Sequence, residues 1–175
     1  LWSDMGNYYG AGYSSHTFKD NYVEVFFRSS SIIGDSTKIL KIDPSENTFK
    51  IDNNVLVGKS NKDLSYAYGA SFQNRRLIKG TIPASKENFR VKISMHHPKL
   101  FLKSAVENEC SKLGIKVQKK PSININISMF DTLFTYYSPP LKDLVKCVNY
   151  RSNNNFAEHL LMKSASTQYK LVSLD

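Results

Sequence analysis

Short runs of apolar residues, rich in β-branched and aromatic side chains, alternate with polar turn signals between residues 21 and 95. The segment 89–95 shows this pattern clearly, because alternate residues from Phe89 to Met95 are apolar and fall on one face of a strand. Further strands are predicted at 22–27, 37–42, 48–51, 65–68, 71–73 and 77–82. Strands of this length, with a turn after nearly every one, predict small, mostly antiparallel sheets.

A helical period replaces the strand pattern after residue 97. The helix is predicted to begin at Pro98 and to end near Leu113, where Gly114 is a favourable stop. Its apolar stripe consists of Leu102, Ala105, Val106, Cys110 and Leu113. A strand beginning at 115–117 would complete a β-α-β unit with a right-handed crossover, and alternation predicts a further strand at 123–127. Together these elements predict an α+β fold.

Two shorter helices are predicted near the C-terminal end, each with one apolar face. These faces are formed by Leu141, Leu144, Val145 and Val148, and by Phe156, Ala157, Leu160 and Leu161. The polar residues 152–155 lie between them, and such a corner is typical of either a helix cap or a functional site. As a cap, Ser152, Asn154 or Asn155 would accept a hydrogen bond from the second helix, and Asn155 has capping-box spacing to Glu158.

Length and charge restrict the possible classes of protein. A chain of 175 residues with 41% apolar residues suits one ordinary domain or two small ones. The net charge of +9 permits contact with an anionic partner, but the lysines are dispersed, so no nucleic-acid partner is expected. No apolar run is long enough to predict a membrane span. The chain begins at Leu1 and ends after a strand-like run, which is typical of a piece of a longer protein.

Most catalytic and metal-binding patterns are missing from the sequence. It contains no G-x-S-x-G elbow and no C-x-x-C pair, so zinc and thioredoxin-type sites are not expected. A bridge between Cys110 and Cys147 would be possible in an oxidising compartment, but free, half-buried thiols are expected. The adjacent residues His96 and His97 have no acidic or thiol ligand near them in the sequence, and neither a metal nor a cofactor is expected. The glycines of residues 6–12 lack dinucleotide-binding spacing, and this segment is predicted to be a packed loop with buried tyrosines.

One catalytic pattern does occur. Residues 152–154 fit the S-x-N signature of serine enzymes that act on penicillin and D-Ala-D-Ala peptides. The match extends to Ser-Pro-Pro-Leu at 138–141, Ala-Glu-His-Leu-Leu at 157–161, Gly-Asn-Tyr-Tyr-Gly-Ala at 6–11 and Asp-Asn-Tyr at 20–22. With these segments the chain resembles the D-alanyl-D-alanine carboxypeptidase/endopeptidase family of penicillin-binding proteins, the low-molecular-mass class with a large insertion in the catalytic domain.

The resemblance implies an acyl-enzyme mechanism on peptidoglycan stem peptides and cross-links, with β-lactams as acylating ligands. The whole enzyme would use a serine in S-x-x-K as nucleophile and a lysine in K-T-G. Carried onto this chain, Ser152 would relay a proton between the catalytic lysine and the leaving amine. Asn154 would hydrogen-bond the peptide backbone of the substrate. The resemblance also implies a location in the periplasm or cell envelope.

The chain departs from the family pattern because it contains neither S-x-x-K nor K-[ST]-G. In the family the first motif precedes the insertion and the second follows S-x-N. Residues 1–120 are therefore expected to be the insertion, and residues 121–175 a return strand and helices of the serine penicillin-binding, β-lactamase-like catalytic domain. Such a slice is expected to be inactive alone, with two helices that lack their usual packing partners. The alternative is a non-catalytic basic module that contacts the anionic cell envelope or nucleic acid.

Overall fold

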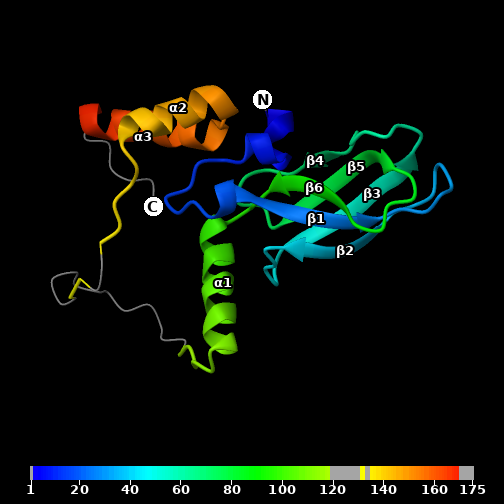
Figure 1. Cartoon of the computed structure of the whole chain (residues 1–175), viewed down its shortest axis with the longest axis horizontal. Coiled ribbons are helices and arrows are strands. Elements are labelled where there is room, and N and C mark those ends of the chain that lie inside the picture. Colours follow the sequence, from blue (N-terminus) through cyan, green and yellow to red (C-terminus); the bar gives the residue numbers. More distant parts are fainter. Residues whose placement is uncertain (1, 119–130, 133–134, 170–175) are drawn as a thin grey trace.

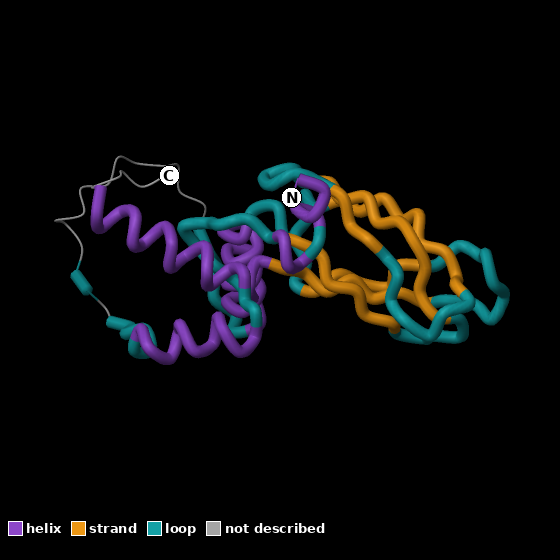
Figure 2. Tube along the Cα trace, turned by 90° about the horizontal axis from the view of Figure 1, so that it is seen from above, coloured by secondary structure: helices purple, strands orange, loops and turns teal. Residues whose placement is uncertain are grey.

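The computed structural model describes residues 2–118, 131–132 and 135–169. Two three-stranded sheets lie at one end of the molecule and the α-helices at the other (Figures 1 and 2). The α+β class and the small sheets predicted from the sequence are therefore confirmed. None of the helices among these residues is long and apolar enough to cross a membrane.

The first sheet is fully antiparallel and has the order β2-β1-β6. Its strands are β1 (Tyr22–Arg28), β2 (Lys38–Asp43) and β6 (Phe89–Ser94). Alternation along β1 turns Val23, Val25 and Phe27 into the core, where all three are fully buried. A strand with such a continuous inner face suits the middle of the sheet, because both of its edges are then paired.

The second sheet has the order β3-β5-β4 and contains the parallel pair β3–β5, which the sequence pattern did not predict. Its strands are β3 (Lys50–Gly58), β4 (Tyr66–Tyr68) and β5 (Arg75–Pro83). The strand predicted at 48–51 overlaps the start of a longer one, because β3 continues to Gly58, and within it Asn53 Nδ2 donates to the Thr37 carbonyl at 2.7 Å. The strand predicted at 71–73 is a turn with Phe72 at a φ of 64°.

A buried guanidinium group ties the two sheets together. Arg76 of β5 is fully buried, and its Nε donates to Ser94 Oγ of β6 at 3.2 Å. Its two terminal nitrogens donate to the carbonyls of Gln73 at 2.7 Å and Met95 at 3.3 Å. Burial lowers the pKa of Arg76 to about 10, so the side chain stays protonated at neutral pH. Arg76 of the second sheet is thus held by oxygens of Ser94 and Met95 at the end of β6, in the first sheet, and of Gln73 in the turn before β5.

The helix α1 (Pro98–Lys112) begins and ends close to the predicted residues, but its apolar stripe is not buried as a whole. Pro98 and Phe101 are buried, whereas Val106 is 53% exposed and Leu113 is 75% exposed. Residues 115–118 form no strand, which corrects the strand predicted to begin there. The second strand of the β-α-β unit is therefore absent at the described residues predicted to begin it, and the further strand predicted at 123–127 lies outside the described residues.

Candidate functional site

The predicted corner between two helices is present. The helix α2 (Leu141–Arg151) is followed by Ser152 at its C-cap, and α3 (Asn154–Tyr169) begins two residues after Ser152. Ser152 is exposed and has left-handed backbone angles, with φ 48° and ψ 45°. Such a conformation costs a residue other than glycine about 1–2 kcal/mol, and local strain of this kind gathers at functional sites. The turn directs the chain from one helix into the next within two residues.

The cap of α3 is Asn153, not Ser152, Asn154 or Asn155 as the sequence predicted. The backbone N–H of Phe156 donates to Asn153 Oδ1 at 3.0 Å, which is the bond that an N-cap side chain makes to the third residue of a helix. The two S-x-N side chains that carry the proposed chemistry are therefore not used to cap the helix. Cap and candidate site occupy neighbouring positions of one turn.

The Gly-Asn-Tyr-Tyr-Gly-Ala segment folds into tight 3₁₀ turns against the sheets. A Cβ atom at Gly6 would overlap the Ala67 backbone, and one at Gly10 would overlap the Asp4 carbonyl, so both positions require glycine. Between them, buried Asn7 accepts the Ala67 N–H at 3.0 Å through its Oδ1. Tyr8 and Tyr9 are nearly half exposed, contrary to the predicted buried tyrosines, and their rings meet edge to face.

The corner packs directly on this N-terminal segment. Asn154 Nδ2 donates to the Tyr9 carbonyl at 2.7 Å. Asn155 is 5% exposed, and its Oδ1 accepts a hydrogen bond from Asn21 Nδ2 at 3.5 Å. Asn21 has a φ of 57° and is itself buried, with its Oδ1 bonded to Phe18 N–H at 3.1 Å. The segments on which the family resemblance rests are therefore neighbours in space.

A second contact holds α3 further along its length. His159 Nε2 lies 2.6 Å from Thr17 Oγ1, and its ring packs 4.6 Å from the ring of Tyr13, measured between centroids. Burial lowers the pKa of His159 below its usual value, so the imidazole is neutral at neutral pH. Neutral His159 suits the hydroxyl of Thr17, since one of its ring nitrogens accepts and the other donates.

A cavity of about 170 Å³ opens between the corner and the sheets. It is lined by Tyr8, Tyr9, Asp20, Tyr22, Lys92, Arg151, Ser152, Asn153, Asn154 and Asn155. The two predicted site residues thus share one cavity with tyrosines from both N-terminal segments. Among the lining residues, only Ser152 and Asn154 were predicted as site residues. Arg151 and Asn155 flank the S-x-N motif without belonging to it, and Lys92 carries no recognisable motif.

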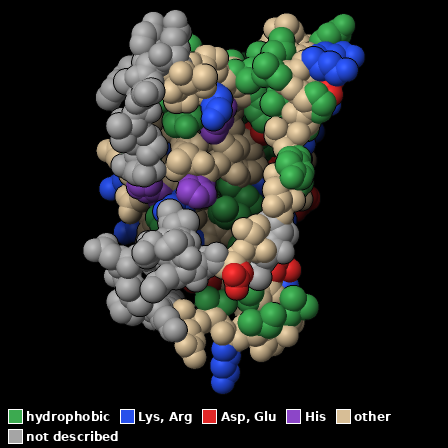
Figure 3. Space-filling model, turned by 90° about the vertical axis from the view of Figure 1, so that its left-hand side faces the viewer, with side chains coloured by type: hydrophobic (Ala, Val, Ile, Leu, Met, Phe, Trp, Pro, Cys, Tyr) green, Lys and Arg blue, Asp and Glu red, His purple; other side chains and the backbone are tan. Residues whose placement is uncertain are grey.

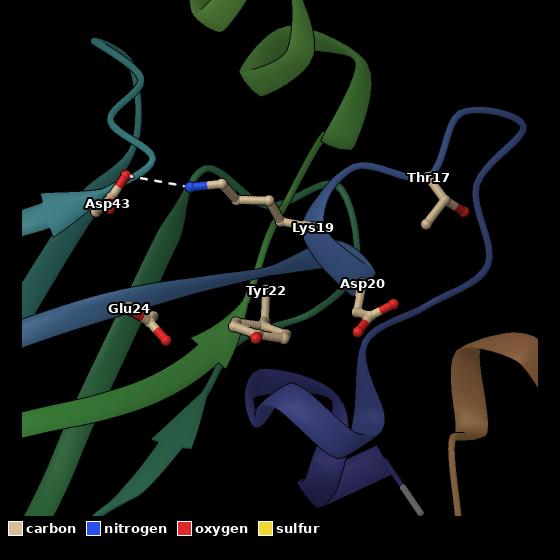
Figure 4. Close-up of a pocket in the computed structure, with 6 residues that line it drawn as sticks. All are labelled: Thr17, Lys19, Asp20, Tyr22, Glu24 and Asp43. Carbon is tan, nitrogen blue, oxygen red and sulfur yellow. Dashed lines mark hydrogen bonds and ion pairs between the residues drawn. The ribbon is translucent and has the colours of Figure 1, made fainter. Parts of the chain in front are cut away.

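A larger cavity of about 490 Å³ is lined by residues of β1 and of the turn before it, and by Asp43 of β2 (Figure 4). Asp20 and Tyr22 line both cavities. The larger one contains no residue of the corner, and Lys19 crosses it to pair with Asp43 at 3.4 Å. Its acidic side chains give no metal cluster, since the described residues contain no group of three His, Cys, Asp or Glu side chains suited to one.

Both cysteines are free and half-buried, as the sequence predicted. The apolar faces of the two C-terminal helices are only partly covered, with Leu141 at 64%, Val145 at 41% and Leu161 at 63% exposure. The view from the helical end of the molecule shows apolar side chains at the surface (Figure 3). Parts of these apolar faces therefore have no packing partner within the described part of the chain.

A family model describes the class of protein that this fold and corner define. The model of the D-Ala-D-Ala carboxypeptidase 3 (S13) family matches residues 1–173, and the chain belongs to that family. The family resemblance seen in the sequence is thereby confirmed. A comparison with individually curated proteins found no match to the chain.

Two solved structures resemble the fold. The first is the crystal structure of penicillin binding protein 4 (dacB) from Haemophilus influenzae, with a TM-score of 0.69 and 20% sequence identity over 97% of this chain. The second is the same protein complexed with a novel β-lactam, with a TM-score of 0.63 and 21% identity over 90% of this chain. The match covers 38% of the first structure and 36% of the second, so this chain spans little more than a third of their length.

Proposed function

We propose that this chain supplies two parts of a serine-type D-Ala-D-Ala carboxypeptidase. Residues 1–120 are its insertion, and residues 121–175 are the return strand and helices of the catalytic domain that carry S-x-N. The observation that supports this proposal is the shared cavity, in which Ser152 and Asn154 meet Tyr8 and Tyr22 of the insertion. A corner that served only as a helix cap would not need these segments around it.

The proposed reaction is acyl transfer. A serine nucleophile, supplied by an S-x-x-K segment outside this sequence, gives its proton to the catalytic lysine as it attacks the D-Ala-D-Ala carbonyl, and the C–N bond breaks as D-alanine leaves. The Ser152 hydroxyl passes a proton from the catalytic lysine to the departing amine, which becomes neutral as it leaves. Water then attacks the ester and releases the acyl product, restoring the serine hydroxyl.

Asn154 holds the substrate in this scheme. One amide hydrogen of Asn154 is already given to the Tyr9 carbonyl at 2.7 Å, and this bond fixes the side-chain plane. The Oδ1 atom and the second hydrogen remain for a peptide N–H and carbonyl of the substrate. A neutral amide and hydroxyl orient the substrate and pass protons without adding charge beside the reacting carbonyl.

The substrates that follow are peptidoglycan stem peptides and cross-links, with β-lactams as ligands that acylate the same nucleophile. Cleavage of cross-links would add endopeptidase activity to the carboxypeptidase. Such substrates place the protein in the periplasm or cell envelope. The Haemophilus influenzae structure that contains a β-lactam supports β-lactam binding by proteins of this fold.

Acylation by labelled penicillin tests the proposal. The longer protein that contains this chain together with S-x-x-K and K-T-G segments should be acylated, and the 175-residue chain should not. Replacing Ser152 with alanine in the longer protein should slow acylation by about tenfold or more, since proton transfer contributes about 10²–10⁴-fold to such reactions. Unchanged acylation of S152A would remove the role given to Ser152. An unlabelled longer protein would favour the basic binding module instead.

A further inference from the structure

Lys92 is a half-buried cation at the wall of the corner cavity. Its Nζ donates to the Tyr22 hydroxyl at 3.1 Å and lies 4.4 Å from the centroid of the Tyr22 ring and 5.8 Å from that of Tyr8. Two aromatic faces and a hydroxyl hold this ammonium group in place. Its position is therefore fixed by the fold rather than left free in solvent.

Within the described part of the chain, no carboxylate lies within ion-pair distance of this ammonium group. Glu24 is its partner in the register of β1 and β6, but Glu24 pairs with Arg90 at 3.2 Å instead. Most lysines that lose part of their hydration recover the cost through an anionic partner. Lys92 has only neutral partners in the structure, so it remains able to bind an anion.

The remaining wall of the cavity also offers mainly hydrogen-bond donors. Arg151 immediately precedes Ser152 and lines the same space. Asn155 Nδ2 is buried without a hydrogen-bond partner, although the side chain lines the cavity. Asp20 is the one carboxylate among the lining residues, against the two cations. The volume of about 170 Å³ is several times the roughly 30 Å³ of a water molecule, so a carboxylate and its methylene group fit.

We propose that this cavity is a subsite for a carboxylate on the acyl part of the substrate peptide, bound between Lys92 and Arg151. The subsite rests on the proposed function. The leaving group of a carboxypeptidase is a single amino acid, whereas the acyl part continues for several residues away from the reacting carbonyl. A carboxylate on that part meets a preorganised ammonium group, and the charge-assisted hydrogen bond fixes its position.

Steady-state hydrolysis of two peptides by the longer protein tests the subsite. The probes are γ-D-glutamyl-L-lysyl-D-alanyl-D-alanine with a free α-carboxylate on the glutamyl residue, and the same peptide with a carboxamide there. Losing one charge-assisted hydrogen bond corresponds to about a tenfold change or more. Lys92→Met should therefore lower kcat/KM about tenfold for the acid peptide and less than about twofold for the amide. Lys92→Arg should keep most of the preference.

Lys41→Met is the matched control, because Lys41 also lies over an aromatic ring, 4.4 Å from the centroid of Phe26, but does not line the cavity. It should leave both peptides unaffected. Equal loss on both peptides in Lys92→Met, or equal kcat/KM for the two peptides in the unmodified protein, would overturn the subsite. Acylation by labelled penicillin is measured first. If the unmodified protein is not acylated, both the proposed function and the subsite are rejected. If it is acylated but hydrolyses the acid and amide peptides equally well, only the subsite is rejected.

Discussion

Replacing Asn153 separates helix capping from the proposed chemistry of the corner. The Asn153 Oδ1 atom accepts the Phe156 N–H at 3.0 Å in a partly buried setting. Alanine removes this acceptor, and loss of an N-cap side chain costs about 0.5–2 kcal/mol, so Asn153→Ala should lower the free energy of unfolding by about 1 kcal/mol. Asn153→Asp keeps an acceptor oxygen and adds a negative charge at the start of a 16-residue helix.

That charge favours the helix by about 0.3–1 kcal/mol, so Asn153→Asp should be at least as stable as the unmodified chain. The expected difference between the two variants is therefore about 1.5 kcal/mol. Urea unfolding followed by far-UV circular dichroism measures it, and hydrogen exchange at the Phe156 and Ala157 amides reports on the first turn of α3 directly. Those amides should lose protection in Asn153→Ala and keep it in Asn153→Asp.

Ser152→Ala is the matched variant, because it changes the neighbouring residue and keeps a side chain on the same left-handed backbone. Its side chain is exposed, so the free energy of unfolding should change by less than about 0.5 kcal/mol. The reasoning is refuted if Ser152→Ala destabilises the chain as much as Asn153→Ala does, because the hydroxyl would then be the cap. It is equally refuted if Asn153→Ala leaves the exchange at Phe156 unchanged.

Two further predictions concern the buried charges. His96 is almost fully buried, and burial together with neighbouring His97 lowers its pKa to about 4 in the folded protein. In the unfolded chain the pKa of His96 is about 6.5, so between about pH 4 and about pH 6.5 the unfolded state binds more protons than the folded state. The free energy of unfolding should therefore fall as the pH falls from about 6.5 to about 4. In His96→Phe, urea titrations should show that the free energy of unfolding depends on pH less steeply, by about 1.4 kcal/mol per pH unit. An unchanged slope would contradict this prediction. Arg76→Lys keeps the charge, but one ammonium group cannot bond Ser94, Gln73 and Met95 together. Thermal melts should therefore show that the free energy of unfolding falls by about 2–3 kcal/mol. Unchanged stability would mean that the Arg76 guanidinium group does not join the two sheets.

Much of the fold follows from apolar periodicity, because that signal is local. β1, β6 and α1 begin and end near the predicted residues, since their apolar residues repeat with the period of the element. Which residues far apart in the sequence pair with one another cannot be seen from such a local pattern. Arg76 lies just before the strand predicted at 77–82, and its burial is apparent only when Ser94 and Met95 are placed beside it. The parallel pairing of β3 and β5 was missed for the same reason.

The candidate site was found by its motif, and its details required the structure. Ser152 and Asn154 were predicted from the S-x-N pattern, and they do lie together in one cavity. Three consecutive asparagines offer three possible caps that differ by one residue, and sequence spacing does not distinguish them. Lys92 carries no motif at all. Its setting appears only when Tyr8 and Tyr22 are brought over its ammonium group by the folded sheet.

The hydrogen bonds between the corner and the N-terminal segment join residues that are far apart in the chain. Asn154 and Tyr9 are separated by 145 positions, and Asn155 and Asn21 by 134. Ribosomes add about 5–20 residues each second, so the tyrosine segment waits about 7–30 seconds during synthesis before the corner is made. Closing a loop of this length costs chain entropy of about 4 kcal/mol, which favours late docking of the corner on sheets that have already formed. The cavity of the proposed site is thus expected to be among the last parts of the molecule to assemble and among the first to open.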